Sequence, residues 1–271
     1  MSTDPSLAID IEKIIKSRAG NKKIPGFLIS WLKKAIHQDF LNGYLTQGYE
    51  GVEFCERSLE YLGVNVNVEG LENLDSLPED AHLTFASNHP LGGIDGITLG
   101  AVIGRRYDGK IRYLVNDLLM NLKGLAPLCV PINKIGGQAR NLPVLINEAF
   151  QSDDQMIIFP AGLCSRKTNG VICDREWGKA FIAKSVQTGR YVVPVHFIGE
   201  NSKRFYRVAN LCKKLKLKFN FAMLLLPDEL YKGRGKTFTV KFGEPVPSSV
   251  FDSSKTAVEW AQWVKEKCYS L

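Results

Sequence analysis

The chain has 271 residues, of which 45% are hydrophobic and 23% charged, so it is long enough for a sizeable core and its composition excludes wholesale disorder. Its 35 basic and 28 acidic residues give a net charge of +7, which favours anionic partners such as phosphate groups, lipid surfaces, acidic proteins or nucleic acid. The longest uninterrupted apolar run, 221–226, is far shorter than the roughly 20 residues of a membrane-spanning helix, which excludes integral insertion but leaves surface binding open.

Apolar side chains recur at helical spacing before residue 63, in the segments 7–15, 28–36 and 52–62. Pro25 fits the first turn of the second helix. We therefore expect a helical N-terminal extension over 1–63.

From Val64 onward, short apolar runs alternate with amphipathic stretches. Strands are predicted at 64–68, 82–86, 111–115, 128–132, 155–159, 192–198, 219–225 and 237–242, and helices at 95–106, 138–151, 176–188, 203–216 and 254–268. Several of the runs are apolar on both faces, which is typical of strands covered by helices on both sides of a sheet. The sequence thus predicts one α/β domain over 64–271.

The six cysteines are scattered without a C-x-x-C pair, and the four histidines form no i, i+4 pair. Both patterns lack the spacing of structural zinc ligands. We expect reduced thiols, no bound metal and no bound cofactor.

A histidine in an unusual setting follows the predicted strand 82–86. Asn88-His89 is followed by a loop with Gly92-Gly93, and then by Asp95 at the start of a helix. A carboxylate that holds one imidazole nitrogen orients the ring as a base suited to a hydroxyl group. The alternative is a polar turn in which His89 bonds to the backbone.

A second loop, 159–167, follows the predicted strand 155–159. Its Pro160, Gly162, Ser165 and Arg166 suit a loop that binds an anion through backbone N–H groups and a guanidinium. A solvated basic loop is the alternative. Cys164 or Ser165 is also a candidate nucleophile, although the setting lacks the second glycine of a nucleophile elbow.

Further candidate residues are a lysine at the end of a predicted strand, a histidine inside a strand, and lysines beside apolar segments. Lys134 ends the predicted strand 128–132, where it can face a cleft, whereas His196 lies inside an apolar strand and is expected to be structural. Lysines beside apolar residues at 211–226, and at 27–34, fit interfacial membrane anchors. Core-facing elements with a solvated basic edge are the alternative for both segments.

In this order, the motifs resemble the signature of the glycerolipid (lysophospholipid) acyltransferase superfamily, the PlsC-like enzymes. That signature is Asn-His, then four intervening residues and Asp; next Ile-x-Arg; then Phe-Pro-Glu-Gly-Thr-Arg-Ser; and finally an apolar run containing Val-Pro. The corresponding residues here are Asn88-His89 with Asp95, Ile132-Asn133-Lys134, Phe159-Pro160-Ala161-Gly162-Leu163-Cys164-Ser165 and Val192-Val193-Pro194-Val195. The resemblance implies a mixed, mostly parallel sheet flanked by helices.

The chain departs from this pattern in two of the motifs. Five residues instead of four separate His89 from Asp95, which requires a bulge at Gly92-Gly93. Ala161, Leu163 and Cys164 replace the usual Glu, Thr and Arg, and Arg166 lies two places beyond the Arg position. The variant is similar to the hemolysin-like branch, whose members O-acylate lyso forms of ornithine or glycine lipids. An acceptor that carries a carboxylate in place of a phosphate is implied.

The resemblance implies transfer of a fatty acyl group from acyl carrier protein or acyl-CoA to the hydroxyl of a lyso-lipid, either a lyso-amino-acid lipid or lysophosphatidate. His89 is expected to act as general base, oriented by Asp95. The residues expected to bind substrate are Asn88, Gly92, Gly93, Lys134, Pro160, Gly162, Ser165 and Arg166.

We expect a cytoplasmic protein that is peripheral on the inner face of the cell membrane and binds no nucleic acid. Two rival functions remain open. One is a hydrolase that uses Cys164 or Ser165 with His196, and the other is a noncatalytic lipid-binding or membrane-scaffold protein.

Overall fold

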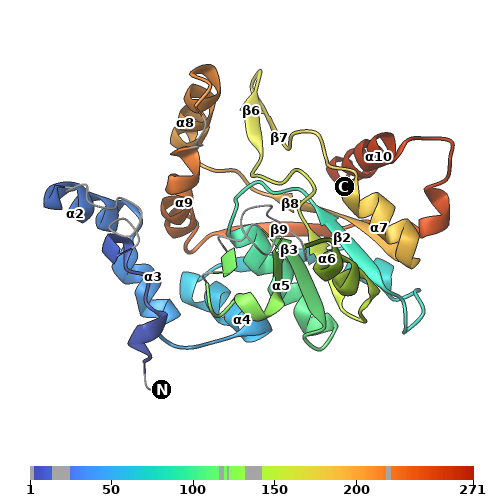
Figure 1. Ribbon diagram of the computed structural model, residues 1–271, viewed down its shortest axis with the longest axis horizontal. Coiled ribbons are helices and arrows are strands. Elements are labelled where there is room, and N and C mark those ends of the chain that lie inside the picture. The colour runs from blue at the N-terminus through green and yellow to red at the C-terminus, as the bar shows by residue number, and fades with distance from the viewer. Residues whose placement is uncertain (1–2, 14–24, 116–118, 121, 132–141, 218–220) are drawn as a thin grey trace.

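A computed structural model describes residues 3–13, 25–115, 119–120, 122–131, 142–217 and 221–271 (Figure 1). Its α-helices are α2 (Gly26–Ala35), α3 (Gln38–Leu45), α4 (Gly51–Leu62), α5 (Ile94–Arg106), α6 (Leu142–Gln151), α7 (Ala180–Thr188), α8 (Lys203–Lys214), α9 (Leu226–Lys232) and α10 (Ala257–Tyr269). Its strands are β1 (Asn65–Glu69), β2 (Leu83–Ser87), β3 (Ile111–Val115), β4 (Cys129–Pro131), β5 (Gln155–Ile158), β6 (Arg166–Thr168), β7 (Val171–Cys173), β8 (Tyr191–Ile198) and β9 (Thr237–Phe242).

Seven of the strands form one mixed sheet in the order β1-β9-β8-β2-β5-β3-β4. All neighbouring pairs are parallel except β8 and β9, which are antiparallel. This is the mixed, mostly parallel sheet that the sequence predicts. Strands β6 and β7 form a separate antiparallel hairpin.

Helices cover both faces of the sheet (Figure 1). On one face, α4 and α5 pack against residues such as Phe85, Val193 and Phe197. On the other face, α7 and α10 pack against Ala86 and Val192, and α6 packs against the edge near β4. Because successive residues of a strand point to opposite faces, both faces of β2 and β8 are apolar, which explains their continuous hydrophobic runs.

The described part of the N-terminal segment contains the helices α2, α3 and α4, and it is joined to the sheet's core, whereas the end of the predicted helix 7–15 lies outside the described residues. Tyr44 of α3 and Phe54 and Cys55 of α4 are buried in the same cluster as Phe85. At its other end, α3 meets α9 through His37 Nε2, which lies 2.9 Å from Asp228 Oδ1. The boundary between an extension and a domain at residue 63 stays a prediction.

One predicted strand is wrong. The described part of 219–225 is a 3₁₀ helix, η6 (Phe221–Leu225), which runs directly into α9. Periodicity cannot separate a strand from a helix in so short an apolar run, and Pro227 is placed in the first turn of α9, where its missing N–H costs nothing. The hairpin β6–β7 and helix α9 are absent from the predictions. No helix in the described ranges is long and apolar enough to cross a membrane.

Candidate active site

Three neighbouring parallel strands bring the predicted loops together. β8, β2 and β5 lie side by side in the sheet, and the loops that follow β2 and β5 carry His89 and Ser165. Ligands of such sheets bind outside the carboxyl ends of the strands. The two loops also bond directly, because the Ser165 N–H donates to the His89 carbonyl at 2.8 Å.

His89 and Asp95 meet across the glycine loop. Nδ1 of His89 lies 3.0 Å from Oδ2 of Asp95, and no other group in the described chain hydrogen-bonds this nitrogen. The two atoms lie within hydrogen-bonding distance, and they form an ion pair when the imidazole is protonated. The extra loop residue is accommodated at Gly92, whose φ of 76° is open to glycine at little cost.

The Asp95 carboxylate is fully buried and accepts four backbone N–H groups. Leu91 and Gly92 donate to Oδ2 at 2.8 and 3.1 Å, and Gly93 and Gly96 each donate to Oδ1 at 2.9 Å. Burial favours the neutral carboxyl, yet the charge of His89 and these N–H groups hold the pKa of Asp95 below 3.8. The glycine N–H groups are thereby occupied, so substrate contact of Gly92 and Gly93 stays a prediction.

The charge of Asp95 in turn changes the pKa of His89. Burial by itself lowers the pKa of the imidazole, but the nearby carboxylate outweighs this effect and holds the pKa above 6.5. The ring stacks on Phe159, with the ring centroids 4.0 Å apart. His89 Nε2 has no hydrogen-bond partner among the described residues, so this is the nitrogen left for a substrate.

Asn88 fixes the loop to the neighbouring strand. Its side-chain N–H donates to the Phe197 carbonyl at 2.9 Å, and its amide oxygen accepts the Phe197 N–H at 2.7 Å. The amide is 3% exposed. These contacts position His89, and a contact between Asn88 and substrate stays a prediction.

A buried carboxylate that the sequence does not reveal joins the two loops. Asp174, 2% exposed, accepts the Ser165 hydroxyl at 2.6 Å, the Trp177 indole N–H at 2.9 Å and the His89 backbone N–H at 3.3 Å. Burial raises its pKa above 3.8 in spite of these bonds. Asp174 is 85 residues from His89 in sequence, so no local pattern identifies it.

Arg166 begins β6 at the side of the Ser165 loop. Its guanidinium donates to the carbonyl of Cys164 and lies 5.6 Å from the ring centroid of Phe205 in α8. No carboxylate of the described chain pairs with it, so it is available to an anion. Gly162 is exposed with φ at 67°, and Pro160 is partly buried, so their contacts with substrate remain predictions. Lys134 lies outside the described residues.

A family model described as Acyltransferase matches residues 13–271. The chain belongs to this acyltransferase family. Two curated relatives, from Bacteroides thetaiotaomicron and Phocaeicola vulgatus, are each named lyso-glycine lipid O-acyltransferase. They are 56% and 53% identical over 275 residues, with coverage of 100% of this chain and of 100% and 98% of the relatives. The predicted PlsC-like family is confirmed, the relatives' names agree with the predicted branch, and the protein is an enzyme of acyl transfer.

The fold of this acyltransferase also agrees with a solved structure. The crystal structure of the 1-acyl-sn-glycerophosphate (LPA) acyltransferase PlsC from Thermotoga maritima matches with a TM-score of 0.50 and 17% identity. The match covers 96% of this chain and 88% of that chain. The predicted fold class is confirmed.

The residues that a hydrolase would use, Cys164, Ser165 and His196, are poorly suited to nucleophilic attack. Burial raises the pKa of the Cys164 thiol to about 12, so almost no reactive thiolate forms at neutral pH. The Ser165 hydroxyl donates to Asp174 and makes no bond to an imidazole. Nδ1 of His196 has no hydrogen-bond partner among the residues that the structure describes. None of these residues forms the nucleophile and base pair that a hydrolase needs.

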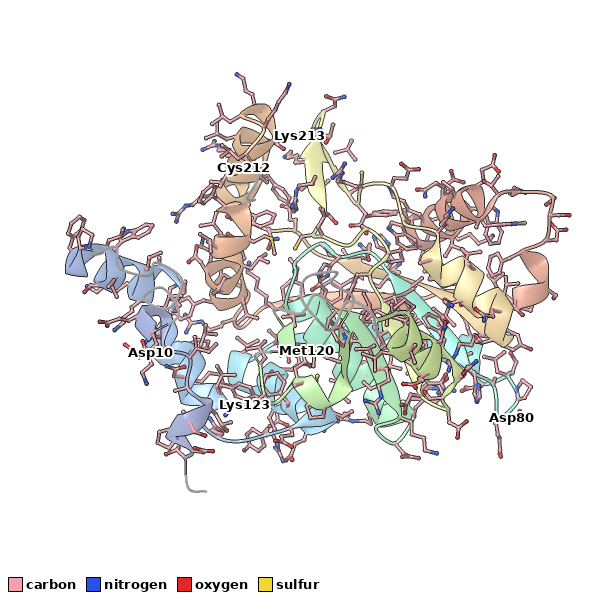
Figure 2. All side chains as sticks on the ribbon, viewed as in Figure 1. Asp10, Asp80, Met120, Lys123, Cys212 and Lys213 are labelled. Carbon is pink, nitrogen blue, oxygen red and sulfur yellow. The ribbon has the colours of Figure 1, made fainter. Side chains whose placement is uncertain are left out.

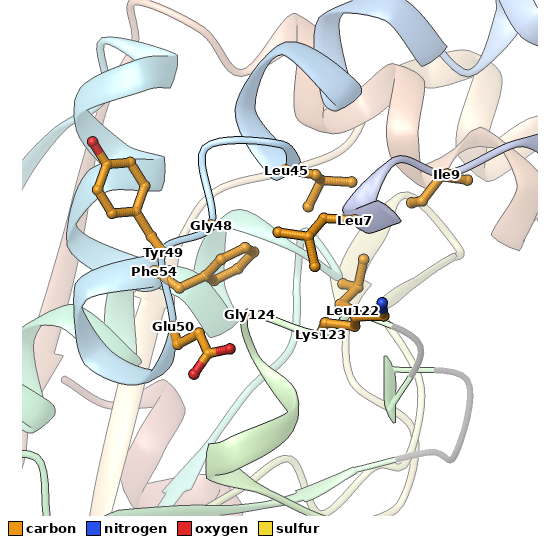
Figure 3. A pocket seen from close by; sticks show the side chains of 10 residues that line it. All are labelled: Leu7, Ile9, Leu45, Gly48, Tyr49, Glu50, Phe54, Leu122, Lys123 and Gly124. Atoms are coloured by element: carbon orange, nitrogen blue, oxygen red, sulfur yellow. The ribbon is translucent and has the colours of Figure 1, made fainter. Parts of the chain in front are cut away.

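Two hollows differ sharply in size. A crevice of about 10 Å³ lies between the N-terminal segment and α4, where Leu7, Leu45 and Phe54 line it (Figure 3). It holds one water molecule at most, and no motif residue lines it. The second hollow, of about 350 Å³, is lined by Asn88, Pro90 and Ser165, so it lies beside the loops described above.

Proposed function

We propose that this acyltransferase moves a fatty acyl group from a thioester to the hydroxyl of a lyso-glycine type lipid, with His89 as the general base. The observation that carries the proposal is the contact between His89 and the buried Asp95 carboxylate in a chain whose relatives are named lyso-glycine lipid O-acyltransferases. Asp95 orients the ring and stabilises the imidazolium as it forms.

In the proposed reaction, Nε2 of His89 takes the proton of the acceptor hydroxyl. The oxygen attacks the thioester carbonyl, the C–O ester bond forms, and the C–S bond breaks. The imidazolium then gives its proton to the departing thiolate. No covalent acyl-enzyme is required, in keeping with the raised pKa of Cys164.

Arg166 and Lys134 are proposed to hold the anionic head group of the acceptor. Arg166 is half-buried, carries no ion pair in the described chain and lies next to the Ser165 loop. Nη1 donates to the carbonyls of Cys164 and Ser165, and the N–H groups on Nε and Nη2 suit a carboxylate as well as a phosphate. The protein acts with no bound cofactor.

The acyl donor is proposed to be acyl carrier protein or acyl-CoA. The net charge of +7 suits both, because the carrier protein is acidic and coenzyme A carries phosphates.

The enzyme is proposed to work at the inner face of the cell membrane as a peripheral protein. Phe27 and Trp31 of α2 are 77% and 55% exposed, and Leu215 after α8 is 57% exposed. Helix α8 extends away from the sheet, and Lys213 lies at its far end (Figure 2). Exposed apolar side chains beside lysines suit an anionic lipid surface.

Product analysis tests the proposal directly. Purified protein is incubated with acyl carrier protein and CoA thioesters and with either N-(3-hydroxyacyl)glycine or lysophosphatidate, and the esters are identified by mass spectrometry. We expect the diacylated glycine lipid. Release of free fatty acid without ester points to the hydrolase, and lipid binding without any product points to the noncatalytic protein.

A further inference from the structure

The hollow of about 350 Å³ opens at the carboxyl ends of β2 and β8. Asn88 and Pro90, the two neighbours of His89, both line it. Its position outside the carboxyl ends of parallel strands is where sheets of this kind bind ligands. A substrate that fills this hollow therefore lies against the loop that presents His89.

One wall of the hollow is formed by His196. Nδ1 of His196 is buried and has no partner in the described chain, and the ring lies 5.2 Å from the ring of Tyr269. Burial and the charge of Lys241 lower the pKa of His196, so the ring is neutral at pH 7. A neutral imidazole offers one donor and one acceptor, and a buried polar atom left unpaired is costly.

Two hydroxyl groups complete the polar wall. The Tyr269 oxygen accepts the Asp174 N–H at 2.8 Å, so its own proton is directed either to the neighbouring Ser165 hydroxyl or to a ligand in the hollow. Ser165 donates its proton to Asp174, which leaves lone pairs on its oxygen for another donor. The wall thus combines donors with acceptors.

Charge disfavours an anion in this hollow. Glu200 lines it, the Asp174 carboxylate lies directly behind Ser165, and no described lysine or arginine is among the lining residues. A neutral ligand with one donor and one acceptor matches these groups better than a carboxylate or a phosphate does.

We propose that this hollow is a subsite for a secondary amide of a substrate. An amide carries one N–H donor and one carbonyl acceptor without net charge, so its N–H suits Ser165 or His196 and its carbonyl suits Tyr269. The inference rests on the proposed function, in which both substrates contain such amides. One source is the pantetheine arm of the thioester donor, and the other is the N-acyl amide of the lyso-glycine lipid.

Matched substrate pairs test the subsite and distinguish the two sources. The donor pair is S-acyl-N-acetylcysteamine, which keeps the amide nearest the sulfur of the pantetheine arm, and its analogue with an ester oxygen in place of the amide N–H. The acceptor pair is N-(3-hydroxyacyl)glycine and its analogue with an ester oxygen in place of the amide N–H. We expect KM to rise about tenfold across one of the two pairs, because one buried hydrogen bond is lost.

The variants His196→Phe and Tyr269→Phe locate that effect in the hollow. In each, the tenfold difference within the affected pair is expected to shrink to about twofold or less, whereas His82→Phe, at the opposite end of β2, keeps it. Thermal unfolding checks that each variant folds. Calorimetric binding of each substrate pair repeats the comparison without turnover.

Unchanged ratios in both variants, or no difference within either pair in the unmodified protein, overturn the subsite. A failure of the proposed function looks different, because the unmodified protein then forms no ester from any pair. In that case the calorimetric comparison still decides whether the hollow binds an amide.

Discussion

Nδ1 of His89 lies 3.0 Å from Oδ2 of Asp95 although residues 90–94 separate them in the chain. The loop closes because Gly92 adopts a left-handed conformation and because four N–H groups of the loop and helix α5 bind the carboxylate. The position of the acid is thus fixed independently of the histidine. Substitution of His89 and substitution of Asp95 are therefore expected to have distinguishable effects on turnover and on stability.

Replacing His89 with alanine is expected to abolish most turnover without unfolding the protein. General-base assistance contributes roughly 10² to 10⁴ in rate, and the Asp95 carboxylate keeps its four backbone donors after the imidazole is removed. Turnover under saturating substrate and the thermal midpoint measure the two quantities. His82→Ala, at a partly exposed histidine that directly precedes β2, is the matched control. Retention of more than about a tenth of the rate in His89→Ala contradicts the general-base role.

Activity is expected to rise with pH through a midpoint above 6.5. The base must be neutral, and Asp95 raises the pKa of His89 above its ordinary value of 6.5. In Asp95→Asn that charge is absent, so the acid limb of kcat/KM is expected to move to lower pH while the maximal rate falls. An acid limb that stays in place in this variant shows that His89 is not the titrating group.

The same pair predicts how stability depends on pH. The folded pKa of Asp95 lies below 3.8, so its contribution is present above pH 3.8 and is lost as the pH falls through the folded value. The folded pKa of His89 lies above 6.5, so its contribution is present below pH 6.5 and is lost as the pH rises through the folded value. Urea unfolding of the parent protein and Asp95→Asn across this range measures the effect. If the free energy of unfolding depends on pH equally in both proteins, the charges of His89 and Asp95 do not stabilise each other.

Alanine substitutions at Gly92 and Gly162 are expected to lower the stability of the fold by different amounts. An alanine Cβ at Gly92 would clash with Cys164 Sγ, whereas at Gly162 it meets nothing within 4 Å, and both positions have positive φ. Gly162→Ala is expected to cost about 1–2 kcal/mol of stability from backbone strain. Gly92→Ala adds overpacking of about 1–3 kcal/mol and displaces the loop that presents His89. Denaturant unfolding compares the two variants.

The double variant Gly92→Ala, Cys164→Ala tests the steric cause. Removing Sγ is expected to restore part of the stability and turnover that Gly92→Ala loses, although the Leu226 side chain still lies 3.0 Å from the new atom. Cys164→Ala alone is expected to keep turnover, because the buried thiol takes no part in the reaction. Loss of all activity in that single variant favours the hydrolase.

Sequence patterns find those parts of the site that lie within one loop. The strands before His89 and Ser165 are continuous apolar runs, so β2 and β5 and the loops after them are predictable from local composition. Asp174 is different, because its contacts with His89 and Ser165 depend on the hairpin β6–β7, whose short strands include the polar residues Arg166–Thr168. Nothing in the neighbourhood of Asp174 distinguishes it from a solvated acid. The strand predicted over the apolar run of η6 is wrong for a different reason. Its hydrophobicity suits either a strand or a short helix, so the pattern alone cannot choose between them.

Arg166→Ala is expected to raise the KM for the lyso-lipid acceptor with little change in the KM for the thioester. The guanidinium has no carboxylate partner in the described chain and is held in place by the carbonyls of Cys164 and Ser165. Its removal leaves only Lys134 of the two cations proposed to hold the acceptor's anion. A charge-assisted hydrogen bond of about 1.5–3 kcal/mol corresponds to a rise of roughly 10- to 150-fold. Arg105→Ala, at the exposed end of α5, controls for loss of one positive charge. If acceptor KM is unchanged in Arg166→Ala, or changes equally in Arg105→Ala, the arginine does not bind the acceptor at this site.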